Sequence, residues 1–348
     1  MPTFSRRLFL GSAAAAGLSV PVLAEAATPR LVNPVVKQRA DSQIFKHADG
    51  YYYFTGTVPE YDRLILRRSK TLAGLTDAEE AVVWRRPETG RMGGYIWAPE
   101  ILWFDGQWHL YFGAGDKDQP FRVRTYVLST SDANPLSAKW DAPVQVEMPW
   151  DTFNLDATAF EHKGVRYMVW AQKEPGVDTN SNLYMAPMKT PSTLAAKPVR
   201  LTVPTYDWEC VKYKVAEGPA VLVRNGYVFI TYSGSATDAN YCMGMLTAKA
   251  DADLMDPASW TKSPVPVFKS SEAHQVWGPG HNAFTVDEKG RDVLVYHARD
   301  YKEIKGNSLF DPNRHTRVQY FRYRKDGTPD FGEPVAIGPL KRPMFGKF

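Results

Sequence analysis

The chain has 348 residues, with 42 Lys and Arg against 38 Asp and Glu, so its formal net charge is only +4. This charge gives no sign of the basic surface that phosphate neutralisation requires, which argues against a nucleic-acid partner. Hydrophobic residues make up 44% and charged residues 23%, the ordinary mix of a folded globular protein. The 10 Trp, 18 Tyr and 17 Phe favour β structure and supply flat faces that suit sugar rings.

The first residues have the pattern of an export signal. The segment SRRLFL at positions 5–10 is typical of a twin-arginine signal, and a small-sided apolar run follows it to Leu23. This run is shorter than the roughly 20 apolar residues of a membrane span, and AEA at 24–26 offers a cleavage site. We expect residues 1–26 to be a cleaved signal peptide, residues 27–348 to be the folded domain, and the protein to be periplasmic or secreted. A Sec signal or an uncleaved anchor is the alternative.

A turn pattern recurs five times along the rest of the chain. Each copy has an apolar strand, a two-residue turn that ends in glycine, and an aromatic and β-branched run. Strand, tight turn and strand in a regular repeat predict an all-β protein with a single five-bladed β-propeller, rather than a β-sandwich. The five predicted turns are Asp49-Gly50, Asp105-Gly106, Lys163-Gly164, Asn225-Gly226 and Lys289-Gly290.

The repeat predicts which side chains meet at the centre. The innermost strand of each propeller blade faces the central channel, so equivalent positions converge there. Lone buried carboxylates are costly unless they are paired or functional. Two carboxyl groups around a sugar fit glycoside hydrolysis, one ionised as the base and one protonated as the acid, and a third nearby raises the pKa of the acid. Nine residues before the turn glycines lie Asp41, Trp97, Leu155, Glu217 and His281, with Asp156 next to Leu155.

Five segments from about residue 31 to the end resemble glycoside hydrolase family 43, specifically its exo-acting α-L-arabinofuranosidases. They are RADSQIFKHADGYYYFTGTVPEYDR, YIWAPEILWFDGQWHLYFGAG, NLDATAF, VAEGPAVL and WGPGHNAF. The resemblance implies that Asp41 is the general base, Glu217 the general acid, and Asp156 the residue that orients the acid and raises its pKa. It also implies inversion, with base and acid carboxyl groups about 6.5–9.5 Å apart. The family usually has proline after the base, whereas this chain has Ser42.

The resemblance extends to the residues around the carboxylates. It implies that Arg299 binds a sugar hydroxyl and that Tyr61, in the loop VPEYDR, walls the pocket. Trp97 and Trp277 are expected to contact substrate, although a core position is the alternative for Trp97. His281 is expected to contact a water-ligated calcium ion in the channel. A single histidine does not make a calcium site, because calcium prefers oxygen ligands.

The sequence therefore predicts an enzyme that releases terminal α-L-arabinofuranosyl units from arabinan, arabinoxylan or derived oligosaccharides of the plant cell wall, with no cofactor required for the chemistry. A β-xylosidase or an endo-arabinanase would use the same carboxylates, and a sugar-binding propeller without catalysis is the non-enzyme alternative. Cys210 and Cys242 are expected to be buried thiols, with a disulfide bond as the alternative.

Overall fold

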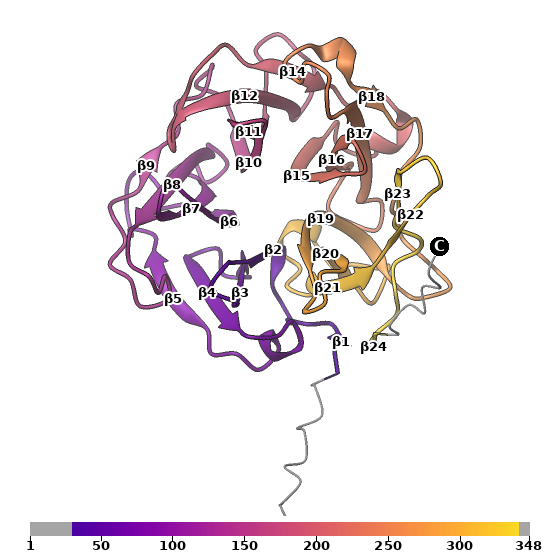
Figure 1. Ribbon diagram of the computed structural model, residues 1–348. Coiled ribbons are helices and arrows are strands. Elements are labelled where there is room, and N and C mark those ends of the chain that lie inside the picture. Colours follow the sequence, from indigo (N-terminus) through magenta and orange to yellow (C-terminus); the bar gives the residue numbers. More distant parts are fainter. Residues whose placement is uncertain (1–29, 341–348) are drawn as a thin grey trace, which may run out of the picture.

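Five antiparallel sheets follow one another along the chain and surround a central axis in the computed structural model, which describes residues 30–340 (Figure 1). This arrangement confirms the predicted five-bladed β-propeller. In each sheet the strand that is first in the chain lies nearest the axis, as Figure 1 shows. The predicted signal peptide, residues 1–26, lies outside the described residues. No helix within residues 30–340 has the length and apolar character to cross a membrane.

The blades share one strand order, from the axis to the rim. Blade 1 consists of β2 (Ala40–Lys46), β3 (Tyr52–Thr57), β4 (Arg63–Ser69) and β5 (Ala81–Arg85). Blade 2 consists of β6 (Ile96–Phe104), β7 (Gln107–Ala114), β8 (Arg124–Thr130) and β9 (Val144–Gln145). Blade 3 consists of β10 (Asn154–His162), β11 (Val165–Gln172) and β12 (Asn182–Thr190), with β13 (Thr193–Leu194) and β14 (Val199–Thr202) both paired to β12.

The last two blades and the connecting elements complete the disc. Blade 4 consists of β15 (Ala216–Arg224), β16 (Tyr227–Gly234), β17 (Cys242–Lys249) and β18 (Thr261–Lys262). Blade 5 consists of β19 (Trp277–Val286), β20 (Asp292–Arg299) and β21 (His315–Tyr320). Two short ribbons pair β1 (Val32–Asn33) with β24 (Gly338–Pro339) and β22 (Arg322–Tyr323) with β23 (Pro329–Asp330). The 3₁₀ helices are η1 (Ala73–Leu75), η2 (Asp207–Glu209), η3 (Pro257–Ser259) and η4 (Ser308–Phe310).

The turns between the two innermost strands are of two kinds. In blades 2, 3 and 4 the turn has two residues, both with positive φ, as at Asp105 (51°) and Gly106 (72°), which matches the twist of the flanking strands. The prediction of two-residue turns is wrong for blades 1 and 5, whose turns span residues 47–51 and 287–291. There the carboxylates of Asp49 and Asp287 accept backbone N–H groups within the turn and stabilise a wider loop.

Aromatic side chains fill the spaces between blades. Trp108 in β7 and Trp170 in β11 are both fully buried, and each packs among residues of its own and the neighbouring blade. This packing accounts for much of the high aromatic content. Cys210 and Cys242 are free thiols; Cys242 is buried and Cys210 is half-buried.

The chain closes its own ring between the first described residues and blade 5. β1 pairs with β24, and Val36 bridges to Thr316 in β21. The side chain of Asn33 also accepts from the N–H of Val318 (2.9 Å) and donates to its carbonyl (2.7 Å). The segment before β2 therefore extends blade 5 and joins it to blade 1.

Candidate active site

Every inner strand is distorted near the same end. The pairing with the second strand shifts register there, and a residue with positive φ lies within the shift: Asp41 (48°), Ala98 (47°), Asp156 (58°), Gly218 (55°) and His281 (43°), with Gly278 (60°) in a second shift of β19. Such bulges re-aim side chains next to functional sites. Positive φ in a residue with a side chain is strained and persists only where the surroundings hold it.

These positive-φ residues define which positions are equivalent. Because the turns of blades 1 and 5 are longer, the equivalent residue lies nine positions before the turn glycine there and eight positions before it in blades 2 to 4. Counting nine everywhere was therefore wrong for the middle blades. Asp41, Asp156 and His281 are true equivalents, whereas Trp97 and Glu217 each precede the equivalent residue by one.

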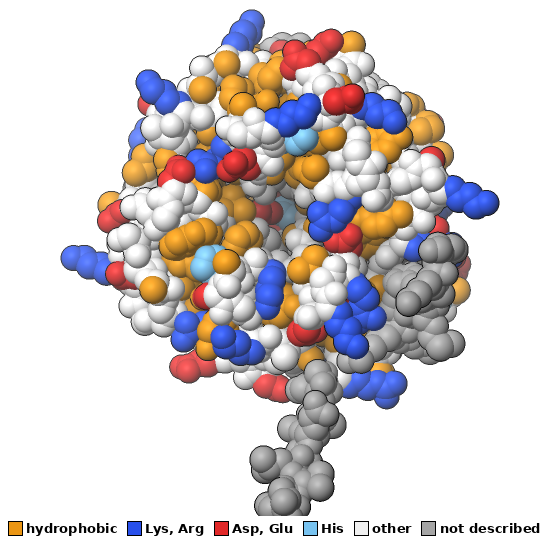
Figure 2. All heavy atoms as spheres, in the orientation of Figure 1, with side chains coloured by type: hydrophobic (Ala, Val, Ile, Leu, Met, Phe, Trp, Pro, Cys, Tyr) orange, Lys and Arg blue, Asp and Glu red, His pale blue; other side chains and the backbone are white. Residues whose placement is uncertain are grey.

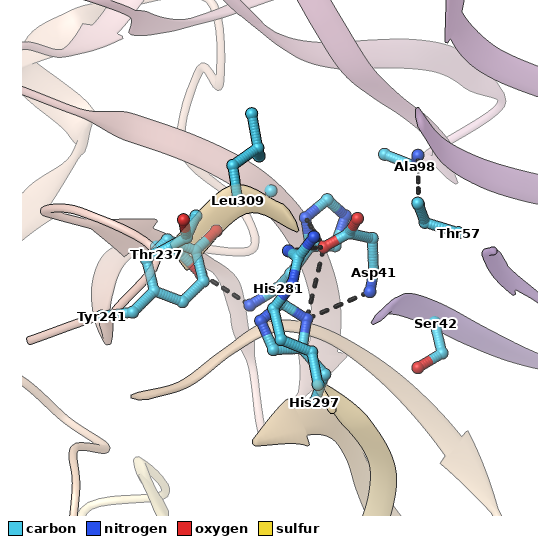
Figure 3. Close-up of polar contacts among 12 residues, drawn as sticks. Asp41, Ser42, Thr57, Ala98, Thr237, Tyr241, His281, His297 and Leu309 are labelled. Carbon is cyan, nitrogen blue, oxygen red and sulfur yellow. Dashed lines mark hydrogen bonds and ion pairs between the residues drawn. The ribbon is translucent and has the colours of Figure 1, made fainter. Parts of the chain in front are cut away.

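Neighbouring blades hold the distorted strands in place. Thr57 at the end of β3 accepts the N–H of Ala98 at 2.8 Å, and Ser233 in β16 accepts the N–H of His281 at 2.7 Å. Each acceptor lies seven residues after its turn glycine, in the blade that precedes the one it holds. The strained backbone is thus fixed by hydrogen bonds between blades, which Figure 3 shows for Thr57 and Ala98.

Asp41 is buried and faces one cation and two imidazoles (Figure 3). Its Oδ1 lies 3.3 Å from Arg314 Nη1, 3.3 Å from His297 Nδ1 and 3.5 Å from His281 Nδ1. Burial lowers the pKa of His297 to about 4, so its neutral Nδ1 accepts the N–H of Asp41 at 3.0 Å. Burial opposes ionisation of Asp41, but the charge of Arg314 and the interactions with His281 and His297 together outweigh it and hold the pKa of Asp41 well below its usual range. Asp41 is therefore ionised, as a base must be.

Glu217 and Asp156 form a coupled acid pair on the opposite side of the centre. Burial raises the pKa of Glu217 to about 7, against a hydrogen bond that the hydroxyl of Tyr241 donates to its Oε1 at 2.9 Å. Burial, and then the charge of Glu217, raise the pKa of Asp156 well above its usual range. Asp156 Oδ2 accepts the N–H of Gly218 at 2.8 Å. The two carboxyl groups titrate as a unit that keeps a proton near neutral pH.

These groups lie in one pocket of about 470 Å³. Figure 2 looks onto a hollow at the middle of the disc, with acidic and histidine side chains deep within it. The volume falls in the range of about 300–1,000 Å³ that small-molecule sites occupy. Trp97 lines the wall, and no residue in the described part of the chain accepts from its buried Nε1. Ser308 and Leu309 line the pocket from the loop that precedes β21.

The structure places three predicted substrate contacts away from the pocket wall. The side chain of Arg299 is buried behind it and donates to Asp311 (3.0 Å) and to the carbonyls of Thr237 (2.9 Å) and Ser308 (2.7 Å). These bonds hold the loop before β21, and Arg299 is not among the residues that line the pocket, so the expected contact with a sugar hydroxyl has no support from its position. This arginine shapes the wall through the loop.

Tyr61 and Trp277 also lie outside the pocket lining. Tyr61 is buried behind Trp97, with ring centroids 5.9 Å apart, and its hydroxyl donates to the carbonyl of Leu309. Through these two contacts Tyr61 supports the pocket wall from behind, and its backbone has a positive φ (53°). Trp277 begins β19 and lies beneath the ammonium of Lys302, 5.4 Å from the ring centroid.

Three residues at the site escaped the sequence analysis. Arg314 and Tyr241 come from loops outside the strand repeat, so spacing gave no signal for them. His297 lies seven residues after the fifth turn glycine, the same place as Thr57 and Ser233. A polar residue at that position in blades 1, 4 and 5, where blades 2 and 3 have Gly113 and Ala171, is a signal that could have identified His297.

The expected channel calcium ion has little support from the donors present. Residues 30–340 contain no cluster of three or more His, Cys, Asp and Glu side chains arranged for a metal ion. His281 Nδ1 faces Asp41 and, at 3.9 Å, Asp156 Oδ2. Asp41 Oδ1 faces Arg314 and Asp156 Oδ2 accepts the N–H of Gly218, which leaves the buried Asp156 Oδ1 without a hydrogen-bond partner among the described residues. These side chains do not fit a directly ligated calcium ion, and the water-ligated ion stays a prediction.

Comparison with known proteins agrees with this geometry. The family model for glycosyl hydrolases family 43 matches residues 31–329. The chain is 54% identical over 307 residues to an extracellular exo-α-(1→5)-L-arabinofuranosidase of Streptomyces avermitilis, covering 88% of this chain and 64% of that protein. A protein of the same name from Streptomyces chartreusis is 54% identical over 309 residues, covering 87% and 94%. The chain thus spans a little under two thirds of the Streptomyces avermitilis relative.

A solved structure extends the similarity to three dimensions. The crystal structure of an α-L-arabinofuranosidase from Lactobacillus brevis superposes with a TM-score of 0.85 at 52% sequence identity, covering 88% of this chain and 98% of that one. A thermostable family-43 glycoside hydrolase, at 22% identity and a TM-score of 0.72, shares the fold.

Proposed function

The chain belongs to glycoside hydrolase family 43, and on this premise we propose that it is an inverting exo-α-L-arabinofuranosidase. One observation carries the proposal: a single pocket holds an ionised carboxylate, Asp41, and a protonated carboxyl pair, Asp156 and Glu217. Glycoside hydrolysis by inversion needs this division of protonation states at one sugar. The arabinofuranosidase names of the similar proteins support the choice of sugar.

We propose a role for each carboxyl group. Asp41 takes a proton from a water molecule as the water attacks the anomeric carbon. Glu217 gives its proton to the glycosidic oxygen, and the bond from that oxygen to the anomeric carbon breaks. Asp156 holds the strand next to Glu217 through the N–H of Gly218, while burial and the charge of Asp41 oppose loss of the proton from Glu217. Arg314 favours the ionised form of Asp41 before the proton transfer.

The shape of the pocket supports action on chain ends. The loop that carries Ser308 and Leu309 closes one side, and both Arg299 and Tyr61 bind backbone carbonyls of this loop. A wall fixed at two points favours a pocket for a terminal unit over an open groove. The substrate class we propose is arabinan, arabinoxylan or their oligosaccharides.

We further propose that the protein acts outside the cytoplasm. The twin-arginine pattern at 5–10 and the word extracellular in the names of the two Streptomyces relatives support export. Cell fractionation tests this: a variant with both arginines, Arg6 and Arg7, replaced by lysine should remain in the cytoplasm. Export of this variant at the normal level would contradict a twin-arginine route.

The activity is tested with p-nitrophenyl α-L-arabinofuranoside and p-nitrophenyl β-D-xyloside. We expect release from the arabinoside, and a fall in kcat of about 10²–10⁴-fold in Asp41→Asn, because the base is lost. Glu217→Gln should lose at least as much on linear 1,5-arabino-oligosaccharides. Glu161→Gln is the matched control, since this carboxylate is exposed near the turn end of β10. Proton NMR of the first product should show an inverted anomer.

The outcomes separate the alternatives. Release of p-nitrophenol from the xyloside alone would mean that the same site belongs to a β-xylosidase. Cleavage within linear arabinan, with no release of arabinose, would mean endo action. Binding of arabino-oligosaccharides by a folded wild type that hydrolyses none of them would mean a sugar-binding propeller.

A further inference from the structure

Tyr241 occupies a position in the pocket that connects the acid to the base. It is fully buried, and its hydroxyl donates to Glu217 Oε1 at 2.9 Å. Its ring lies parallel to that of His297, with centroids 5.6 Å apart and 2° between the planes (Figure 3). His297 in turn accepts the N–H of Asp41. One stacked pair therefore reaches from Glu217 on β15 to Asp41 on β2.

The segment WGPG at the start of β19 makes room for this ring. A Cβ at Gly280 would lie 2.5 Å from both Cδ1 and Cε1 of Tyr241, far inside van der Waals contact. A Cβ at Gly278, whose φ is +60°, would lie 2.2 Å from the carbonyl oxygen of Asp238 and 3.7 Å from Tyr241 Cβ. The tyrosine is thus clamped between a glycine backbone and an imidazole, and its hydroxyl has little freedom to leave the carboxyl group.

We propose that Tyr241 is a positioning residue for the acid: its clamped hydroxyl fixes the carboxyl group of Glu217, and its stack on His297 sets the acid in a fixed place relative to Asp41. This inference rests on the proposed function. A phenol that donates to a carboxylate stabilises the ionised form, so Tyr241 lowers the pKa of Glu217 while burial raises it. The position and the proton affinity of the acid then depend on the same hydrogen bond.

The test is Tyr241→Phe, which removes the hydroxyl and keeps the ring in its clamp. Tyr232→Phe is the matched control, because the hydroxyl of Tyr232 is also buried and donates to a carboxylate, Glu209 Oε1, at 2.6 Å. Glu209 is not in the pocket wall. Any general cost of deleting a buried tyrosine hydroxyl appears in both variants, and only an effect on the acid is confined to the first.

Two kinetic measurements separate an effect on proton donation by Glu217 from other effects of the substitution. An unactivated sugar leaving group needs a proton from Glu217, whereas p-nitrophenolate leaves without one. Tyr241→Phe should lower kcat on 1,5-arabinobiose by about tenfold or more and change kcat on the p-nitrophenyl arabinoside far less. The basic limb of the kcat/KM profile should move upward by about one pH unit, because the ionised form of Glu217 loses a stabilising bond. Tyr232→Phe should change neither readout.

A third readout does not require turnover. Carbon-13 NMR of carboxyl-labelled protein, with Glu217→Gln to assign the signal, should show a higher pKa for Glu217 in Tyr241→Phe than in wild type. A folded Tyr241→Phe with an unchanged pKa and an unchanged ratio of the two substrates overturns the inference. Wild-type protein that hydrolyses no arabinoside but shows the NMR shift would overturn the proposed function and leave the role of Tyr241 in fixing Glu217 standing.

Discussion

At the pocket end of the inner strands the pairing shifts register and ionisable groups are buried, whereas at the turn end of β10 the pairing is continuous and the charged side chains are exposed. The contrast is clear in β10. Asp156 has a positive φ and a buried carboxyl group, whereas Gly164, two residues past the other end of the strand, completes a turn with open space around it. Turn geometry follows from the local sequence. The pocket geometry depends on hydrogen bonds from neighbouring blades. The proposed site therefore lies where tertiary contacts impose a backbone conformation that the local sequence does not favour.

The largest expected effect separates two arginines at the opposite ends. Arg314 pairs with buried Asp41, and Arg166 at the turn end pairs with exposed Asp105 at 2.8 Å. Arg314→Met removes the charge that depresses the pKa of Asp41. In the proposed mechanism activity needs ionised Asp41, so the acidic limb of kcat/KM should move to higher pH, with a loss of about 100-fold at pH 5.

The matched variant Arg166→Met should keep full activity and change the free energy of unfolding by less than about 1 kcal/mol, as exposed pairs do. Both variants are measured by initial rates across pH and by urea unfolding. Equal losses of activity in the two variants would show that the two ends do not differ in this way.

The pH dependence of the wild type is the second expected effect. In the proposed mechanism activity needs Glu217 protonated, a state present below its pKa of about 7 and lost above it. The value of kcat/KM for an unactivated arabino-oligosaccharide should therefore fall by about tenfold for each pH unit above the limb. Asp41, with a depressed pKa, keeps the acidic limb at low pH. A basic limb near the ordinary pKa of an exposed glutamate would mean that burial does not govern the acid.

The smallest expected effect compares two glycines with positive φ. Gly218 (55°) lies at the pocket end, and an added Cβ there would lie 3.0 Å from His281 Nδ1; Gly164 (77°) has open space. Both substitutions to alanine should cost about 1–2 kcal/mol of stability for the left-handed backbone. Gly218→Ala should also lower kcat, since His281 must shift beside Asp41. Urea unfolding measures the stability of each variant, and initial rates measure its kcat. Equal activity in the two variants would contradict the predicted displacement of His281 by the added Cβ.

The fold could be predicted because its signals are local and repeated. Asn225-Gly226 and its relatives mark turns whose geometry the two residues themselves determine, and the runs after them are β-branched and aromatic. The lengths of the first and last turns could not be predicted in this way. They depend on bonds from Asp49 and Asp287 to backbone groups, which a dipeptide pattern does not reveal.

The site was predictable only where it belongs to the repeat. Asp41, Asp156, Glu217 and His281 come from inner strands, so spacing alone brought them to one pocket, which the structure shows. Arg314 and Tyr241 come from loops, and their approach depends on packing between blades. Arg299, Tyr61 and Trp277 were expected at the wall by resemblance, yet their side chains support loops or lie outside the lining.

The closure of the disc by Asn33 has a consequence for how the chain is made. Its bonds to Val318 join residues 285 positions apart. Every other contact between the first and last blades likewise forms only when these two parts of the chain come together. A nascent chain emerging from the ribosome can assemble its early blades, but the edge of blade 1 stays open until blade 5 has been synthesised. Joining such distant segments carries a large loop-closure entropy. We therefore expect ring closure to be the late, slow step of folding.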